Sequence, residues 1–175
     1  MTGFPANSVR PYTAAVLTVS DRAHRGERAD VSGPAVVAAL QQQGFQVVAT
    51  ELVPDHRISI ENSLIRLSDR AQLVVTTGGT GVAESDVTPE ATETVCDRLV
   101  PGIPERMRIA SAQSTPLAAL SRALCGIRGA SLILNLPGSP RAATESLSAV
   151  IHLLPHALEL LSGRTEHADA NARDH

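Results

Sequence analysis

A glycine-rich segment, Thr77-Gly78-Gly79-Thr80-Gly81, closes the apolar run that begins at Leu73. Glycine tolerates positive φ angles, so such a loop can bring main-chain N–H groups close to an anion, and a phosphate would fit there. On spacing alone, a glycine turn that only reverses the chain is an equal alternative. The segment does not match G-x-G-x-x-G and the chain has no lysine, which excludes the dinucleotide-binding and P-loop fingerprints. We therefore expect a phosphate-bearing ligand that is held in another arrangement.

Asp86 lies two residues before Thr88-Pro89-Glu90, a pattern typical of a helix start with a cap residue, a first-turn proline and a first-turn acid. Because Thr88 is expected to cap this helix, Asp86 is free for another task. Beside a phosphate-binding loop, an aspartate would hold Mg²⁺ that bridges phosphates, or would accept a proton or hydrogen bond from the substrate. We therefore place Asp86 at the centre of the chemistry. Asp55 ends another predicted strand, and its spacing alone favours a surface turn.

A second turn, Asn135–Pro140, also follows a predicted buried strand. Its Gly138, Ser139 and main-chain N–H groups could serve a second anionic group. As an isolated turn it would mean little.

Histidine and cysteine residues offer weaker signals. His152 and His156 have the i, i+4 spacing of a metal-chelating pair, but Pro155 interrupts them and no third ligand is near in sequence. A solvated helix face is therefore the favoured interpretation. Cys96 and Cys125 form no C-x-x-C pair and have no metal-ligand spacing, so we expect two reduced, partly buried thiols rather than a disulfide or a nucleophile.

Alternating strand and helix patterns must position these residues. Short apolar, β-branched runs predict buried strands at residues 14–20, 46–53, 73–77 and 132–136. Helical spacing predicts helices over residues 34–44 and 58–69, one starting at Thr88, and a short one over 105–112. Successive strand and helix units imply right-handed crossovers and an α/β fold with a parallel sheet. Ligands of such sheets bind at the carboxyl ends of the strands, where this sequence has its glycines and isolated acids.

The remaining segments are less regular. Residues 121–128 are expected to form a strand or an irregular crossover, and the apolar spacing after Pro140 predicts one long helix that Pro155 kinks. We assign residues 1–13 to a flexible N-terminal leader, residues 14–163 to one catalytic domain and residues 164–175 to a disordered tail.

Composition narrows the function classes. The 175 residues suit one domain, and 43% apolar with 2% aromatic residues predicts a core of Val, Leu, Ile and Ala around a buried parallel sheet. A net charge of -3 without an arginine run disfavours a nucleic-acid partner. All 15 basic residues are arginine, which excludes Schiff-base and Walker lysines. No apolar run reaches the roughly 18 residues of a membrane span and no signal peptide is recognisable, so we expect a cytoplasmic protein.

Taken together, eight motifs in order closely resemble the MogA and MoaB family of molybdenum cofactor biosynthesis proteins, from about Ala14 to Gly163. The motifs are TVSD at 18–21, SGP at 32–34, PD at 54–55, TTGGTG at 76–81, DVTPEAT at 86–92, PGIPE at 101–105, LSR at 120–122 and LILNLPGSP at 132–140. The resemblance implies a three-layer α/β sandwich, with a mostly parallel sheet and helices on both faces. It also implies a homotrimer.

The activity that the resemblance implies is molybdopterin adenylyltransferase: ATP and molybdopterin give adenylylated molybdopterin and pyrophosphate, with Mg²⁺ assisting, at Asp86. It further implies a hand-over of the product to a molybdenum-inserting MoeA-like protein. Asp55 and Asp86 match the two essential aspartates of the family. The implied substrate and nucleotide contacts are Gly78, Gly79, Thr80, Gly81, Thr88, Glu105, Ser121, Arg122, Gly138, Ser139 and Pro140.

One position departs from the family pattern. Members commonly have a basic residue just before the aspartate of DVTP, whereas this chain has Ser85, preceded by Glu84. Two alternatives stay open: a MoaB-like protein that binds the pterin without adenylylating it, and a non-catalytic trimeric scaffold. The presence of both Asp55 and Asp86 favours the enzyme. The short chain favours a stand-alone adenylyltransferase over the multidomain MoeA, gephyrin and CinA-like proteins.

Overall fold

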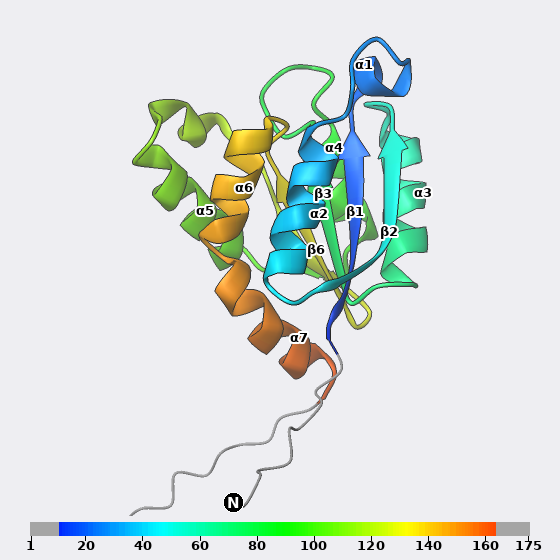
Figure 1. Ribbon diagram of the computed structural model, residues 1–175, viewed down its shortest axis with the longest axis vertical. Helices are drawn as coiled ribbons and strands as arrows, with labels where there is room; N and C mark the ends of the chain where they lie inside the picture. The colour runs from blue at the N-terminus through cyan, green and yellow to red at the C-terminus, as the bar shows by residue number, and fades with distance from the viewer. Residues whose placement is uncertain (1–10, 164–175) are drawn as a thin grey trace, which may run out of the picture.

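A computed structural model describes residues 11–163 and shows six strands in one sheet, in the order β2-β1-β3-β6-β5-β4 (Figure 1). The first four of these strands are parallel, whereas β5 runs antiparallel to β6 and β4 antiparallel to β5. Their bounds are β1 Thr13–Val19, β2 Gln46–Val53, β3 Leu73–Thr77, β4 Arg98–Leu99, β5 Cys125–Arg128 and β6 Ser131–Leu136. The predicted mostly parallel α/β sheet is therefore confirmed.

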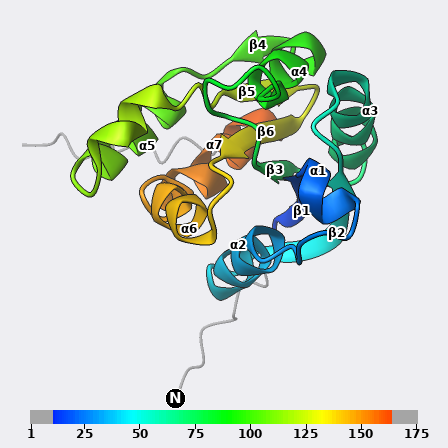
Figure 2. The ribbon, with the colours of Figure 1, turned by 90° about the horizontal axis from the view of Figure 1, so that it is seen from above.

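Helices cover both faces of the sheet, giving three layers. In Figure 1, α2, α6 and α7 lie in front of the sheet and α3 and α4 behind it, while Figure 2 shows α5 beside α6 at one end. The bounds are α1 Asp21–His24, α2 Ser32–Gln42, α3 Arg57–Ser68, α4 Thr88–Val95, α5 Gly102–Ala112, α6 Pro140–Ser148 and α7 Leu154–Leu161, with 3-10 turns η1 Pro116–Leu120 and η2 Ile151–Leu153. No helix in the described range is long and apolar enough to cross a membrane.

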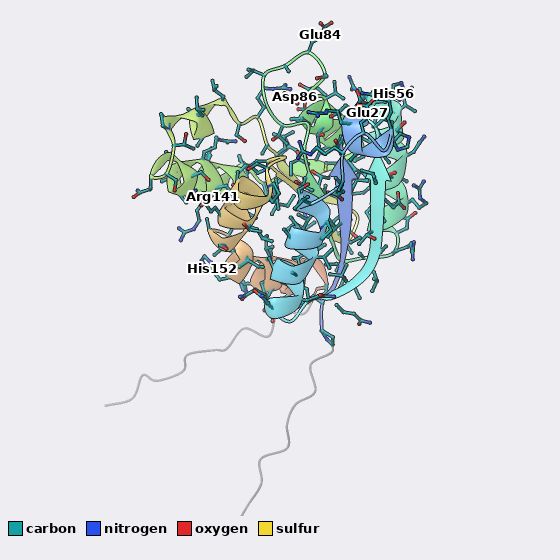
Figure 3. The ribbon with its side chains drawn as sticks, turned by 45° about the horizontal axis from the view of Figure 1, so that its top comes forward. Glu27, His56, Glu84, Asp86, Arg141 and His152 are labelled. Carbon is teal, nitrogen blue, oxygen red and sulfur yellow. The ribbon has the colours of Figure 1, made fainter. Side chains whose placement is uncertain are left out.

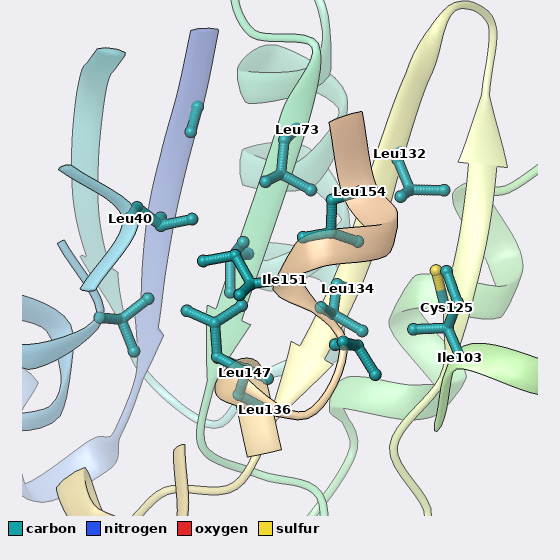
Figure 4. Packing of buried hydrophobic residues seen from close by; sticks show 14 of the residues in the cluster. Leu40, Leu73, Ile103, Cys125, Leu132, Leu134, Leu136, Leu147, Ile151 and Leu154 are labelled. Atoms are coloured by element: carbon teal, nitrogen blue, oxygen red, sulfur yellow. The ribbon is translucent and has the colours of Figure 1, made fainter. Parts of the chain in front are cut away.

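Aliphatic side chains fill the space on each face of the sheet. Figure 4 shows the larger cluster, where Leu40 of α2 and Leu147 of α6 pack over Leu73, Leu132 and Leu134 of the strands. The second cluster joins Ile60, Leu64 and Leu67 of α3 to the opposite side of the sheet. Every residue of β3 and β6 is buried, as expected for central strands covered on both faces.

Some expectations for the elements were wrong. The long helix after Pro140 is two helices, because α6 ends at Ser148, η2 intervenes, and Pro155 lies in the first turn of α7. Proline is well accommodated there, since its missing N–H would have no intrahelical partner. Thr13 belongs to β1 rather than to a leader. For residues 121–128 the strand alternative is confirmed, since they contain the antiparallel strand β5. Residues 1–10 of that leader and the predicted tail, 164–175, lie outside the described range.

Candidate active site at the carboxyl ends of the strands

A cleft of about 320 Å³ opens where β1, β2, β3 and β6 end. It lies at the point where the chain order reverses, since β1 pairs with β2 on one side and with β3 on the other. Open parallel sheets bind ligands at such a reversal. The lining includes Ser20, Arg28, Asp30, Asp55, Gly78, Gly79, Ser85, Asp86, Gly138 and Ser139. The structure therefore brings together the two predicted aspartates and both predicted loops.

The glycine loop leaves β3 through two residues with positive φ, 104° at Gly78 and 63° at Gly79. The Gly78 N–H donates to the carbonyl of Leu136 at 3.1 Å, so this N–H group is not directed at a ligand. Thr88 holds the loop from the other side: its Oγ1 donates to the Gly78 carbonyl at 2.9 Å and its N–H to the Gly79 carbonyl at 3.1 Å. Thr88 is buried, and Val87 is the N-cap of α4. The expectation that Thr88 caps the helix was therefore wrong.

The second loop packs directly on the first. A Cβ atom at Gly138 would lie 3.3 Å from the Cα of Gly78, which is tighter than most such contacts, so a larger residue would push the two loops slightly apart. The Thr77 Oγ1 ties the two loops together by donating to the Pro137 carbonyl at 2.7 Å. Ser139 is the N-cap of α6, where its Oγ accepts a hydrogen bond from the N–H of Ala142 at 3.1 Å. Pro140 is the first residue of that helix.

Asp86 lies at the end of an exposed loop. Its Oδ2 accepts a hydrogen bond from the N–H of Ala83 at 3.0 Å, and its own N–H donates to the Ala83 carbonyl at 2.9 Å. Figure 3 shows Glu84 at the tip of this loop, directed away from the molecule, and Asp86 nearer to its body. Ser85, which stands where the family commonly has a basic residue, lines the cleft. The Asp86 carboxylate thus faces the cleft in a partly exposed position.

Asp55 is tied to Asp21, which ends the TVSD motif but was not among the predicted site residues. Its Oδ2 accepts the N–H of Asp21 at 2.7 Å, and its own N–H donates to the Oδ1 of Asp21 at 2.9 Å. Burial raises the pKa of Asp55; the hydrogen bond from Asp21 opposes this shift, and the charges of Asp21 and Asp86 add to it. Asp55 is therefore a half-buried acid within electrostatic reach of Asp86, and not the surface turn residue that its spacing alone favours.

The charges that line the cleft are mainly negative. Asp30, Asp55 and Asp86 face it, and Arg28 is the one basic residue among its described lining residues. Asp30 is already used within the fold, because it accepts hydrogen bonds from the Thr18 hydroxyl at 2.7 Å and the Gly33 N–H at 2.9 Å. The segment 21–32, which carries Arg28 and Asp30, reads as a polar loop in the sequence. Only its TVSD and SGP motifs at either end signal a role.

These carboxylates fit one kind of metal site. No group of three or more His, Cys, Asp or Glu residues in the described range could hold a metal. Mg²⁺, however, is commonly bound by one or two carboxylates together with water and substrate phosphates. Asp86, with Asp55 nearby, is a donor set of that kind.

Not all predicted site residues line this cleft. Thr80, Gly81 and Ser121 line a second hollow of about 260 Å³, which is bounded by α5, η1 and α6 and is largely apolar. Glu105 is exposed in the first turn of α5 and lines neither hollow. Arg122 is bonded to the loop that carries Asp86. The structure therefore divides most of the predicted residues between two adjoining hollows, which share the wall formed by the glycine loop. The predicted residues that line neither hollow are Thr88, Glu105, Arg122 and Pro140.

Both cysteines are free thiols, as expected. Burial raises the pKa of Cys96 to about 11 and that of Cys125 to about 12. A thiol with so high a pKa carries almost no thiolate at neutral pH. Neither cysteine is therefore a candidate nucleophile.

The chain is similar in sequence and in structure to known proteins. Residues 15–156 match the family described as probable molybdopterin binding domain. The molybdopterin adenylyltransferase of Helicobacter pylori is 47% identical over 152 residues, covering 85% of this chain and 86% of that protein. The molybdopterin biosynthesis enzyme MoaB from Thermus thermophilus is 50% identical, with a TM-score of 0.82 over 87% of this chain and 97% of that one. The Mog protein of Mycobacterium ulcerans is 33% identical, with a TM-score of 0.81 over 87% and 98%.

Proposed function

This chain belongs to the MogA and MoaB family of molybdopterin-binding proteins, and from that premise we propose that it is a molybdopterin adenylyltransferase of molybdenum cofactor biosynthesis. The enzyme transfers the AMP group of ATP to molybdopterin. An oxygen of molybdopterin forms a bond to the α-phosphorus, the bond between that phosphorus and the bridging oxygen breaks, and pyrophosphate leaves. The observation that carries the proposal is the meeting of Asp55, Asp86 and the glycine loop in one cleft.

Adenylyl transfer needs no covalent intermediate on the protein. It depends on in-line positioning of the two substrates and on neutralisation of the charge that develops on the phosphate oxygens. Gly79 and Gly138 offer close backbone approach, Ser139 offers a hydroxyl, and Arg28 a guanidinium. These groups bind and orient the nucleotide, in keeping with a chain that lacks lysine.

The negative cleft favours a substrate that arrives with a divalent cation. Asp55 and Asp86 would repel a bare triphosphate, because like charges in a partly buried site are costly. Asp86 would hold Mg²⁺ on the cleft side of its loop, and Asp55 would support it from the end of β2. The ion supplies positive charge to the phosphate oxygens when bound. This argument supports Mg-ATP rather than free ATP as the substrate.

The second hollow extends the same site. Thr80, Gly81 and Ser121 line it, and the glycine loop separates it from the cleft by a single wall. Its largely apolar surface suits a flat ring system with polar edges, and both substrates contain one. We therefore assign these residues to substrate binding. The exposed Glu105 has no contact that supports such a role.

The proposal includes the setting of the enzyme. We expect a cytoplasmic homotrimer that passes its adenylylated product to a molybdenum-inserting, MoeA-like protein. These expectations follow from the family resemblance, and the similarity to MogA and MoaB structures extends over nearly the whole of their chains.

One alternative function has an observation in its favour. The 50% identical MoaB of Thermus thermophilus is described as a molybdopterin biosynthesis enzyme and not as an adenylyltransferase, so the same fold would also suit a protein that binds molybdopterin without adenylylating it. Purified protein with molybdopterin, ATP and Mg²⁺ decides between the two. The adenylyltransferase releases pyrophosphate and forms the adenylylated pterin in equal amounts. Intact pterin binding without either product would establish the alternative.

A further inference from the structure

A single arginine side chain is bonded along the loop that carries Asp86. The main-chain N–H of Arg122 donates to the Thr80 carbonyl at 2.9 Å, and its Nε donates to the Gly81 carbonyl at 2.7 Å. Its Nη2 donates to the Asp86 carbonyl at 2.5 Å, and its Nη1 forms an ion pair with the carboxylate of Glu90 in α4. Arg122 therefore joins the start of the loop, its end and the following helix.

Apart from the two hydrogen bonds of Thr88 at its base, the loop has little else to fix it. Residues 82–85 are exposed, and the internal bonds of this turn connect Ala83 with Asp86 only. The planar guanidinium presents its donors in a rigid fork, so it can serve several acceptors in different directions at once. A lysine ammonium has the same charge but no such fork. The position of the Asp86 main chain thus depends on the shape of the arginine head as well as on its charge.

The same contacts argue against Arg122 as a substrate ligand. Each of its three guanidinium nitrogens has a protein acceptor. Arg122 does not line the cleft or the apolar hollow. It lines a shallow depression together with Val82, Asp86 and Glu90, and of these three only Asp86 also lines the cleft. The side chains of Arg122 and Glu90 are 37% and 39% exposed, and an isolated ion pair so exposed contributes little to stability. The ion pair with Glu90 instead orients the guanidinium of Arg122 toward the main-chain carbonyls of the loop.

Building on the proposed adenylyl transfer, we propose that Arg122, aimed by Glu90, is a positioning residue that fixes the Asp86 carboxylate in the cleft. We call Arg122, with its hydrogen bonds to this loop and its ion pair with Glu90, the Arg122 clamp. The clamp affects the reaction through Asp86 alone. It holds the carboxylate where it meets the phosphates and makes no contact with either substrate. Arg122 of the LSR motif therefore positions Asp86, the aspartate that begins the DVTPE motif.

The first test replaces Arg122 by lysine. Arg122→Lys keeps the charge but cannot reach Gly81, Asp86 and Glu90 together, and a small misplacement of a catalytic group can lower the rate about a hundredfold. We expect kcat to fall by about that factor, with KM for ATP and for molybdopterin changed by less than about threefold. Arg128→Lys is the matched control, because Arg128 donates to the Val95 carbonyl at the other end of α4. It should leave kcat close to the wild-type value. A rise in KM at unchanged kcat in Arg122→Lys would make Arg122 a substrate ligand and overturn the proposal.

A double-mutant comparison tests whether Arg122 acts through Asp86. In an Asp86→Asn background, adding Arg122→Lys should lower the residual rate by less than about threefold, because residues that act as one unit are not additive. A further loss as large as in the wild-type background would contradict the clamp.

Hydrogen exchange gives a readout that does not depend on the reaction. In Arg122→Lys, the amides of Ala83 and Asp86 should lose protection, whereas in Arg128→Lys they should not. Unchanged protection in Arg122→Lys would overturn the clamp even for an active enzyme. A wild-type protein that forms no adenylylated pterin would instead refute the proposed function, and the exchange result would still decide the clamp.

Discussion

Asp21 and Asp55 exchange hydrogen bonds, each carboxylate accepting the main-chain N–H of the other, at 2.7 Å to Asp55 and 2.9 Å to Asp21. The pair joins the start of α1 to the end of β2, and so attaches the segment that carries Arg28 to the floor of the cleft. Two carboxylates are thereby held close together and partly buried. Ionisation of both carboxylates therefore costs free energy in the folded protein.

Asp55→Asn should lower turnover without lowering stability at neutral pH. The folded pKa of Asp55 lies above its ordinary value of 3.8, mainly because of burial. The stabilising contribution of such a group is therefore present below pH 3.8 and is lost as the pH rises through the folded pKa. The ionised form is the unfavourable one, and asparagine removes its charge while keeping an oxygen that accepts the Asp21 N–H.

Thermal unfolding across the acidic range checks this prediction. At pH 7 the Tm of Asp55→Asn should equal or exceed that of the wild type, and any gain should shrink as the pH falls toward 4. A variant that unfolds earlier than the wild type at pH 7, with full activity, would make Asp55 a purely structural residue.

Asp86→Asn should lower kcat by at least about a hundredfold, because it removes the carboxylate that we propose to meet the phosphates and Mg²⁺. Its amide oxygen can still accept the N–H of Ala83, so the free energy of unfolding should change by less than about 0.5 kcal/mol. Glu84→Gln removes a carboxylate from the exposed tip of the same loop and should leave the rate near the wild-type value. Normal turnover with a lowered Tm in Asp86→Asn would reduce Asp86 to a residue that supports the turn.

Gly78→Ala should destabilise the protein more than Gly26→Ala. Both glycines have positive φ, 104° and 74°, which costs a residue with a side chain about 1–2 kcal/mol. A Cβ at Gly26 would meet nothing within 4 Å, whereas at Gly78 it would collide with the Val19 carbonyl oxygen. Overpacking of this kind adds about 1–3 kcal/mol. Equal free energies of unfolding for the two variants, measured by urea titration, would contradict the close packing of the loop.

We expect the protein to be a homotrimer in solution. Light scattering coupled to gel filtration should give three times the 18.3 kDa chain mass. A single-chain mass that does not change with concentration would refute the trimer.

The sequence was most informative where local composition decides structure. The bounds of β2 and β3 follow from their runs of β-branched and apolar residues, and the glycine loop from its composition. The sequence was least informative where contacts between distant segments determine which partner a side chain has. Thr88 has the type and spacing of a cap, but its hydroxyl donates to Gly78 instead. Likewise, Asp21 belongs to the TVSD motif, but its pairing with Asp55 becomes visible only when β1 and β2 lie side by side in the sheet.

The cleft is assembled from segments that lie far apart in the chain, since Ser20, Asp55, Gly78 and Ser139 follow four different strands. Contacts between such distant residues require large loops to close and form slowly. Catalytic competence should therefore appear only at the last stage of folding, after β6 has joined the sheet. During refolding, the return of activity would report the completion of the whole sheet, and a nascent chain that ends before Ser139 would have a glycine loop without its opposing wall.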